Sequence, residues 1–127
     1  MPSPLRLKRI GDRIQQELST MIVKGEIRDF RLQGVSITEV RVDRELSYAE
    51  IFVSAIEGSE RENEILAGFE SASGFIRKML SERVELRSFP RLRFHWDPTP
   101  EKAAQIEKLI FEIKKEDEAR KKQQSVN

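Results

Sequence analysis

The chain has 127 residues, enough for one domain with a two-layer core but too few for two separate cores. Hydrophobic residues make up 38% and charged residues 35%, so we expect a small core beneath a densely charged surface. The net charge of +1 gives no overall attraction to a polyanion, and the absence of cysteine excludes disulfides, thiolate metal sites and cysteine nucleophiles.

The first predicted helix spans residues 5–23, because apolar residues recur there every three or four positions and Gly25 follows as a stop signal. Basic residues gather in its first turns, where the positive end of the helix dipole disfavours them. A bound polyanion would compensate, although a solvated helix face is the commoner origin of such a cluster. The stripe is Leu7, Ile10, Ile14, Leu18, Met21 and Ile22, and the basic residues are Arg6, Lys8, Arg9 and Arg13.

Two strands should follow a connector at residues 26–34. In Val35–Val42 the apolar residues change face near Thr38-Glu39, and such a slip predicts a β-bulge. Tyr48–Ala55 has apolar residues on both faces, as a central strand does. The mostly polar segment 43–47 between them has the length of a hairpin connection.

A helix is expected to begin near residue 60, because Ser59 and Glu62 form a capping-box pattern. Its apolar stripe is interrupted at Ser71-Ala72-Ser73-Gly74, where glycine alone costs about 1 kcal/mol relative to alanine. We interpret this as a kink before a second helix, Phe75–Arg83. A restarted helix offers unpaired N–H groups to a phosphate, and small residues allow a sugar-phosphate backbone to approach. From the residues alone, a kink that serves only packing is an equal alternative.

Residues 91–97 alternate between apolar and polar side chains, which predicts a strand. A right-handed crossover through the two preceding helices would make it parallel to Tyr48–Ala55. Thr99 and Pro100 then open a last helix. Beyond its apolar stripe, residues 114–127 are charged and polar, and we expect them to form a disordered tail. The helix, strand, strand, kinked helix pair, strand, helix order predicts an α+β fold with helices on one face of a three-stranded mixed sheet.

Catalytic and metal sites find little support. His95 and Asp97 share a strand face and could form an acid/base pair, but no nucleophile turn or glycine-rich phosphate loop accompanies them. Their types and spacing suit a polar outer sheet face better. No calcium or zinc ligand spacing occurs, and no apolar run approaches the roughly 20 residues of a membrane span. We therefore expect no enzyme, cofactor, metal or membrane association.

Cationic residues follow the kink along the chain, and binding is the remaining class of function. We expect phosphate contacts that position the domain and do not read bases. The expected contacts are Arg77, Lys78, Arg83, Arg87 and Arg91, together with Arg6, Lys8, Arg9 and Arg13 of the first helix and the small residues Ser71, Ala72, Ser73 and Gly74.

Four segments occur in an order that is specific when taken together. They are the basic amphipathic helix Arg6–Ile22, the strand block Glu45–Val53, the kink Ala72-Ser73-Gly74 leading into Phe75-Ile76-Arg77, and the segment Pro90–Asp97. Over residues 4–113, which we take as the domain, the sequence resembles the bacterial ribosome-binding factor A family. That resemblance implies a type II KH-like fold in which Ala72-Ser73-Gly74 replaces the usual GXXG loop, so four-nucleotide clamping does not carry over.

The resemblance also implies a function. The family consists of non-enzymatic assembly factors that bind the small (30S) ribosomal subunit and 16S rRNA, assist late maturation and processing, and matter in cold adaptation. We accordingly expect a cytoplasmic monomer with these partners and no small-molecule substrate. The alternative from the residues is a protein–protein interaction adaptor, which the near-neutral net charge permits.

Overall fold

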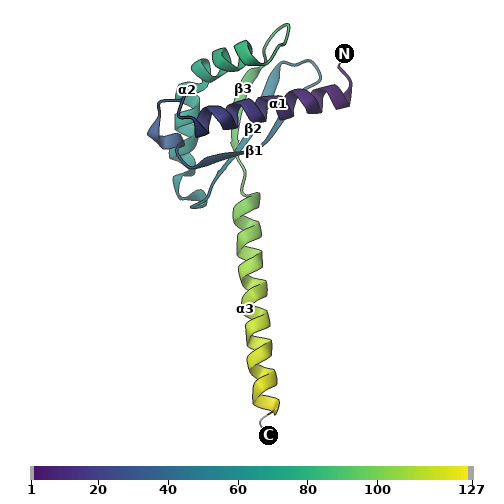
Figure 1. Cartoon of the computed structure of the whole chain (residues 1–127), viewed down its shortest axis with the longest axis vertical. Coiled ribbons are helices and arrows are strands. Elements are labelled where there is room, and N and C mark those ends of the chain that lie inside the picture. Colours follow the sequence, from purple (N-terminus) through teal and green to yellow (C-terminus); the bar gives the residue numbers. More distant parts are fainter. Residues whose placement is uncertain (1, 126–127) are drawn as a thin grey trace. The chain divides into compact units, whose positions relative to one another are not determined.

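The computed structural model describes residues 2–125, which form two compact units divided between Asp97 and Pro98. Figure 1 shows the elements of each unit. The first unit contains α1 (Pro4–Val23), the 3₁₀ helix η1 (Phe30–Leu32), β1 (Val35–Val42), β2 (Tyr48–Ala55), the 3₁₀ helix η2 (Ser59–Arg61), α2 (Glu62–Arg83) and β3 (Arg91–Trp96), and the second is α3 (Thr99–Ser125).

The sheet has the predicted mixed topology. β1 pairs antiparallel with β2, and β3 lies parallel to β2 on its other side. The pairing register of β1 shifts between Ile37 and Glu39, so the predicted bulge is confirmed. The bulge returns Val40 to the buried face, and the Thr38 hydroxyl hydrogen-bonds to the carbonyl oxygen of Phe52 at 3.2 Å.

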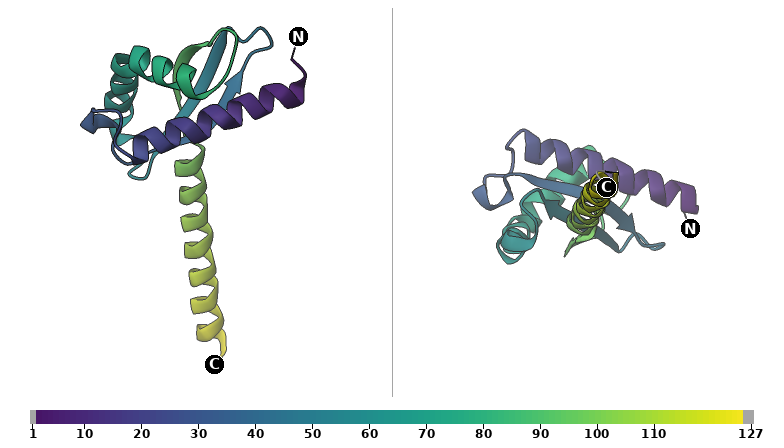
Figure 2. Two further views of the ribbon diagram at one scale, coloured as in Figure 1. Left: turned by 45° about the horizontal axis from the view of Figure 1, so that its top comes forward. Right: turned by 90° about the horizontal axis from the view of Figure 1, so that it is seen from below.

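Both α1 and α2 pack on the same face of the sheet, and α1 runs across the strands (Figures 1 and 2). The aromatic rings of Phe69 in α2 and Phe94 in β3 stack with their centroids 4.7 Å apart. α1 approaches β1 closely at Gly11, where an added Cβ would lie 2.4 Å from the carbonyl oxygen of Val40. The fully buried side chains between the two helices and the sheet are Ile14, Leu18, Met21, Ile51, Val53, Phe69, Ile76 and Leu80.

The expected pair of helices is one bent helix. α2 is helical without interruption from Glu62 to Arg83, although its two halves run in different directions (Figure 1). The expected fresh N-terminus at Ser71–Gly74 is therefore wrong, because a bend within a continuous helix frees no complete set of N–H groups. The expected helix start near residue 60 is confirmed, because η2 begins at Ser59 and α2 follows at Glu62. The capping box is wrong, since Arg61 and not Ser59 occupies the N-cap position of α2.

The second unit is a single helix that extends further than expected. α3 continues to Ser125, whereas we expected disorder from residue 114. Lysine, glutamate, glutamine, arginine and alanine dominate this stretch, and their high helix propensity sustains a helix without burial. Residues 126–127 of the expected tail lie outside the described residues, and the domain limit at residue 113 stays a prediction.

Within its own unit α3 has no second element to cover its apolar side chains. These side chains are exposed at Ile106, Leu109, Ile110, Phe111 and Ile113. The expected monomer rested partly on the absence of an exposed apolar stripe, so the oligomeric state also stays a prediction.

The contact at Gly11 can be tested by Gly11→Ala. The new methyl group would collide with the Val40 carbonyl oxygen, and such overpacking should lower the free energy of unfolding by about 1–3 kcal/mol. Gly74→Ala is the matched control, because an added Cβ there meets nothing within 4 Å and alanine should stabilise a helix by up to about 1 kcal/mol. Urea unfolding measures both changes, and equal stability of the two variants would contradict the close approach.

Candidate nucleic-acid interface

The first turns of α1 present arginines along one side of the helix. Ser3 caps the helix by accepting a hydrogen bond from the backbone N–H of Arg6 at 3.2 Å. Arg6, Arg9 and Arg13 are spaced three and four residues apart and therefore share a face. Lys8 lies on another side, beside β1, and pairs with Asp12 at 3.2 Å.

The loop between α2 and β3 is fastened by Arg77. Its guanidinium donates to the carbonyl oxygens of Phe89 at 2.6 Å and Pro90 at 3.1 Å. We expected Arg77 to be a free phosphate ligand, but the structure gives it a part in holding the loop. Sequence patterns could not reveal this role, because every residue has a backbone carbonyl and the acceptor can therefore be of any residue type.

The loop and α1 enclose two adjoining hollows of about 410 and 390 Å³, which share Arg6 and Leu86. Only two acidic residues, Glu45 and Glu85, are among their lining residues in the described part of the chain. We call this surface the arginine groove. Its cationic lining consists of Arg6, Arg9, Arg13, Arg77, Arg83, Arg87 and Arg91.

Some groove arginines already have ionic partners. Arg13 pairs with Glu17 at 3.1 Å, and Arg83 pairs with Glu26 at 2.7 Å. Within residues 2–125, no carboxylate lies at ion-pair distance from the other groove side chains. These side chains are Arg6, Arg9, Arg77, Arg87 and Arg91, and all five residues are exposed. A guanidinium without a carboxylate partner can bind a phosphate through two parallel hydrogen bonds.

The kink residues lie outside this groove. Ser71–Gly74 do not line either hollow, and Gly74 is exposed with open space at its Cβ position. Lys78 is exposed and does not line the groove either. The structure thus brings together the seven arginines that we predicted and leaves Lys8, Lys78 and Ser71–Gly74 elsewhere, where a role in RNA binding stays a prediction.

The outer sheet face contains the single histidine of the sequence. His95 contacts Glu50, whereas Asp97 accepts a hydrogen bond from Thr38 at 2.6 Å, so each member of the candidate acid/base pair has another partner. Burial raises the pKa of Glu50, but hydrogen bonds from His95 and Arg93 outweigh it and lower that pKa overall. The aromatic rings of Tyr48 and Phe52 also lie here, each under an arginine side chain.

Metal ligands and membrane-spanning helices are two further features that would indicate a function. No cluster of three or more histidine, cysteine, aspartate or glutamate residues in the described part of the chain is placed to hold a metal ion. No helix between residues 2 and 125 has the length and apolar character needed to cross a membrane.

Arg77→Ala should destabilise the protein. Loss of the guanidinium leaves the Phe89 and Pro90 carbonyl oxygens without their donor, and the free energy of unfolding should fall by about 1–2 kcal/mol. Lys78→Ala is the control, because this neighbouring side chain is exposed and should change stability by less than about 0.5 kcal/mol. Thermal unfolding compares the two, and an unchanged midpoint for Arg77→Ala would show that the loop does not depend on it.

Comparison with known proteins shows the family of the chain. A family model described as ribosome-binding factor A matches residues 6–110. Ribosome-binding factor A of Acetivibrio thermocellus is 42% identical over 108 residues, which cover 84% of this chain and 87% of the relative. The crystal structure of ribosome-binding factor A from Thermus thermophilus matches with a TM-score of 0.62 and 25% identity, over 70% of this chain and 93% of that one.

A second Thermus thermophilus structure is a homology model of ribosome binding factor A fitted into a cryo-EM map of its complex with the 30S subunit. It matches with a TM-score of 0.54 and 25% identity, over 66% of this chain and 87% of that one. The match to the family at residues 6–110 includes every arginine of the groove, and this chain belongs to the ribosome-binding factor A family.

Proposed function

We propose that this protein is a non-enzymatic assembly factor that binds the small ribosomal subunit and contacts 16S rRNA through the arginine groove. The observation that supports this most is the convergence of arginines from α1, α2, the following loop and β3 on one surface. The 30S complex of the Thermus thermophilus relative supports the choice of subunit. Family membership supports a role in late maturation and processing of the RNA, in the cytoplasm and with importance in cold adaptation.

The groove suits phosphates better than bases. Its cations are guanidinium groups, which match phosphate oxygens, and its hollows are open and formed partly by aliphatic side chains such as Ile10 and Leu86. Contacts of this kind fix the position of a protein on a nucleic acid without reading its sequence. A groove or junction of folded RNA is therefore a better partner than a linear sequence motif.

Charge reversal in the groove should weaken binding to small subunits. Arg9→Glu with Arg87→Glu removes two cations without ionic partners, and the dissociation constant should rise at least about tenfold at moderate salt. The slope of log K against log salt should also become shallower by about one for each lost phosphate contact. Titration of purified subunits over a salt series measures both quantities.

A control with the same change in net charge is Lys102→Glu with Lys108→Glu, both exposed on α3. This variant should keep the affinity of the unmodified protein. If both double variants weaken binding equally, the net charge determines affinity and the groove is not the RNA site.

Arginine identity should matter in addition to charge. Arg9→Lys with Arg87→Lys preserves the net charge but replaces two planar guanidinium groups, each able to form paired hydrogen bonds, with ammonium groups. We expect the salt slope to stay nearly unchanged, because the number of neutralised phosphates is the same, while affinity at fixed salt falls several-fold. The same titration over a salt series measures the salt slope and the affinity. Full affinity in the lysine variant would show that the groove acts only through its positive charge.

Sedimentation of cell extract tests the proposed function itself. The protein should migrate with free small subunits and not with assembled ribosomes. Ribonuclease treatment before sedimentation separates the alternative, because a protein–protein adaptor would keep its partner after the RNA is digested. Migration at the top of the gradient without any ribosomal particle would contradict the proposal.

A further inference from the structure

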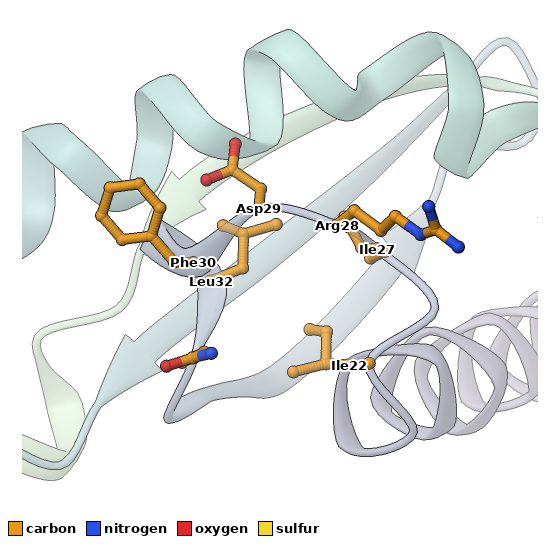
Figure 3. Close-up of a pocket in the computed structure, with 8 residues that line it drawn as sticks. Ile22, Ile27, Arg28, Asp29, Phe30 and Leu32 are labelled. Carbon is orange, nitrogen blue, oxygen red and sulfur yellow. The ribbon is translucent and has the colours of Figure 1, made fainter.

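The connector between α1 and β1 exposes an aromatic residue beside a small apolar pocket. Phe30 of η1 is 74% exposed, and the nearby end of α1 leaves Val23 86% exposed. The pocket has a volume of about 250 Å³, and its apolar lining includes Ile22, Ile27 and Leu32 (Figure 3). Figure 3 shows Phe30 and Arg28 on opposite sides of the view, with Leu32 between them and Ile27 beside Arg28.

This connector is held in place by charged hydrogen bonds. The Asp29 carboxylate accepts from the backbone N–H of Arg31 at 3.0 Å and pairs with its guanidinium at 2.6 Å. Arg61 donates to the carbonyl oxygens of Arg31 at 2.6 Å and Gln33 at 3.3 Å. The hydrogen bond from the Arg31 side chain lowers the pKa of Asp29, which favours the charged form of this carboxylate.

The connector also packs against α2. Leu32 is only 2% exposed, and an added Cβ at Gly68 of α2 would lie 3.0 Å from its Cδ2 atom. Phe30 therefore projects from a rigid turn and not from a loose loop. A rigid, exposed aromatic side chain loses little conformational entropy when a partner covers it, which is typical of an anchor residue in an interface.

The charges around the pocket indicate the chemistry of a partner. Arg28 lines the pocket and is exposed, and no carboxylate in the described part of the chain lies at ion-pair distance from it. Two acidic residues nearby are already neutralised, Asp29 by Arg31 and Glu26 by Arg83. The unpaired charge at this surface is thus positive, and it complements carboxylates beside an apolar group.

The size and walls of the pocket favour a protein segment. Its volume falls below the roughly 300–1,000 Å³ of pockets that enclose a drug-sized molecule, so it suits a side chain. The aliphatic part of its lining, Ile22, Ile27 and Leu32, accommodates a branched apolar side chain. A base stacked on Phe30 is the competing occupant, and a crosslink from position 30 distinguishes the two.

The groove and the pocket meet at one point, because Arg83 of the groove pairs with Glu26, which lies between the pocket residues Gly25 and Ile27. Along α1 they are separated, since Ile22 is nine residues beyond Arg13, about 14 Å along the helix axis.

We propose that this surface, formed by Ile22, Ile27, Arg28, Phe30 and Leu32, docks a ribosomal protein of the small subunit through an apolar side chain flanked by carboxylates. This inference rests on the proposed function, since it assigns a second contact on the same particle. The groove holds rRNA, and the pocket holds protein.

The test compares two probes, purified small subunits and protein-free 16S rRNA, with full-length Phe30→Ala. We expect at least about tenfold weaker binding to subunits and unchanged binding to naked rRNA. The loss should persist at high salt, because the contact is apolar. Phe111→Ala is the matched control, since it removes a phenylalanine that is 63% exposed on α3, and it should leave both affinities unchanged.

Arg28→Glu is the second variant, and it should weaken subunit binding at low salt while preserving the unfolding midpoint, because the side chain is exposed. A photo-crosslinking amino acid at position 30 should then attach to a ribosomal protein in the subunit.

The outcomes separate the two proposals. Equal loss of affinity for naked rRNA in Phe30→Ala, or a crosslink to rRNA, would show that this surface binds RNA and overturn the inference. Wild-type affinity of Phe30→Ala for subunits, alongside a defect in Arg9→Glu with Arg87→Glu, would overturn it and leave the proposed function intact. Failure of the unmodified protein to bind subunits would overturn both.

Discussion

Gly11 brings α1 so near to β1 that no side chain fits between the helix and the carbonyl oxygen of Val40. α1 is a continuous helix of 20 residues, so this contact, together with the buried Ile14, Leu18 and Met21 further along, determines where both of its ends lie. The arginines of its first turns consequently reach the loop that precedes β3, and its last turn reaches the connector that contains Phe30. Both proposed surfaces depend on a glycine that belongs to neither.

The elements of the sheet could be predicted from the sequence because strand burial is a local signal. Val35, Ile37 and Val40 can face the core together only if the strand contains one extra residue between Ile37 and Val40. The pairing register shifts between Ile37 and Glu39, as this requires. The alternation in β3 likewise predicted half-buried Leu92, Phe94 and Trp96 opposite exposed arginines. Period-two patterns need no knowledge of distant segments, and these predictions were confirmed.

The partners of individual charged residues depended on distant segments and could not be predicted in the same way. Arg77 and Arg83 both follow the bend of α2, yet one holds a loop carbonyl and the other pairs with Glu26. Helix α2 also remained continuous where serine and glycine predicted a break. The local propensity cost is about 1 kcal/mol for glycine, and burial of Phe69 and Ile76 on either side outweighs it.

The near-neutral net charge concealed the main electrostatic feature of the fold. Folding gathers seven arginines against two glutamates in one groove, while many of the acidic residues lie elsewhere, among them Glu107, Glu112 and Glu116 of α3. The cationic residues of the groove are all arginines, whereas six of the nine lysines of the chain lie in α3. Guanidinium groups retain directional hydrogen bonds to phosphate oxygens when salt weakens long-range attraction, and lysine ammonium groups contribute mainly the attraction itself. A protein that must stay bound to a structured RNA at cellular ionic strength gains more from a few directed arginines than from a large net charge.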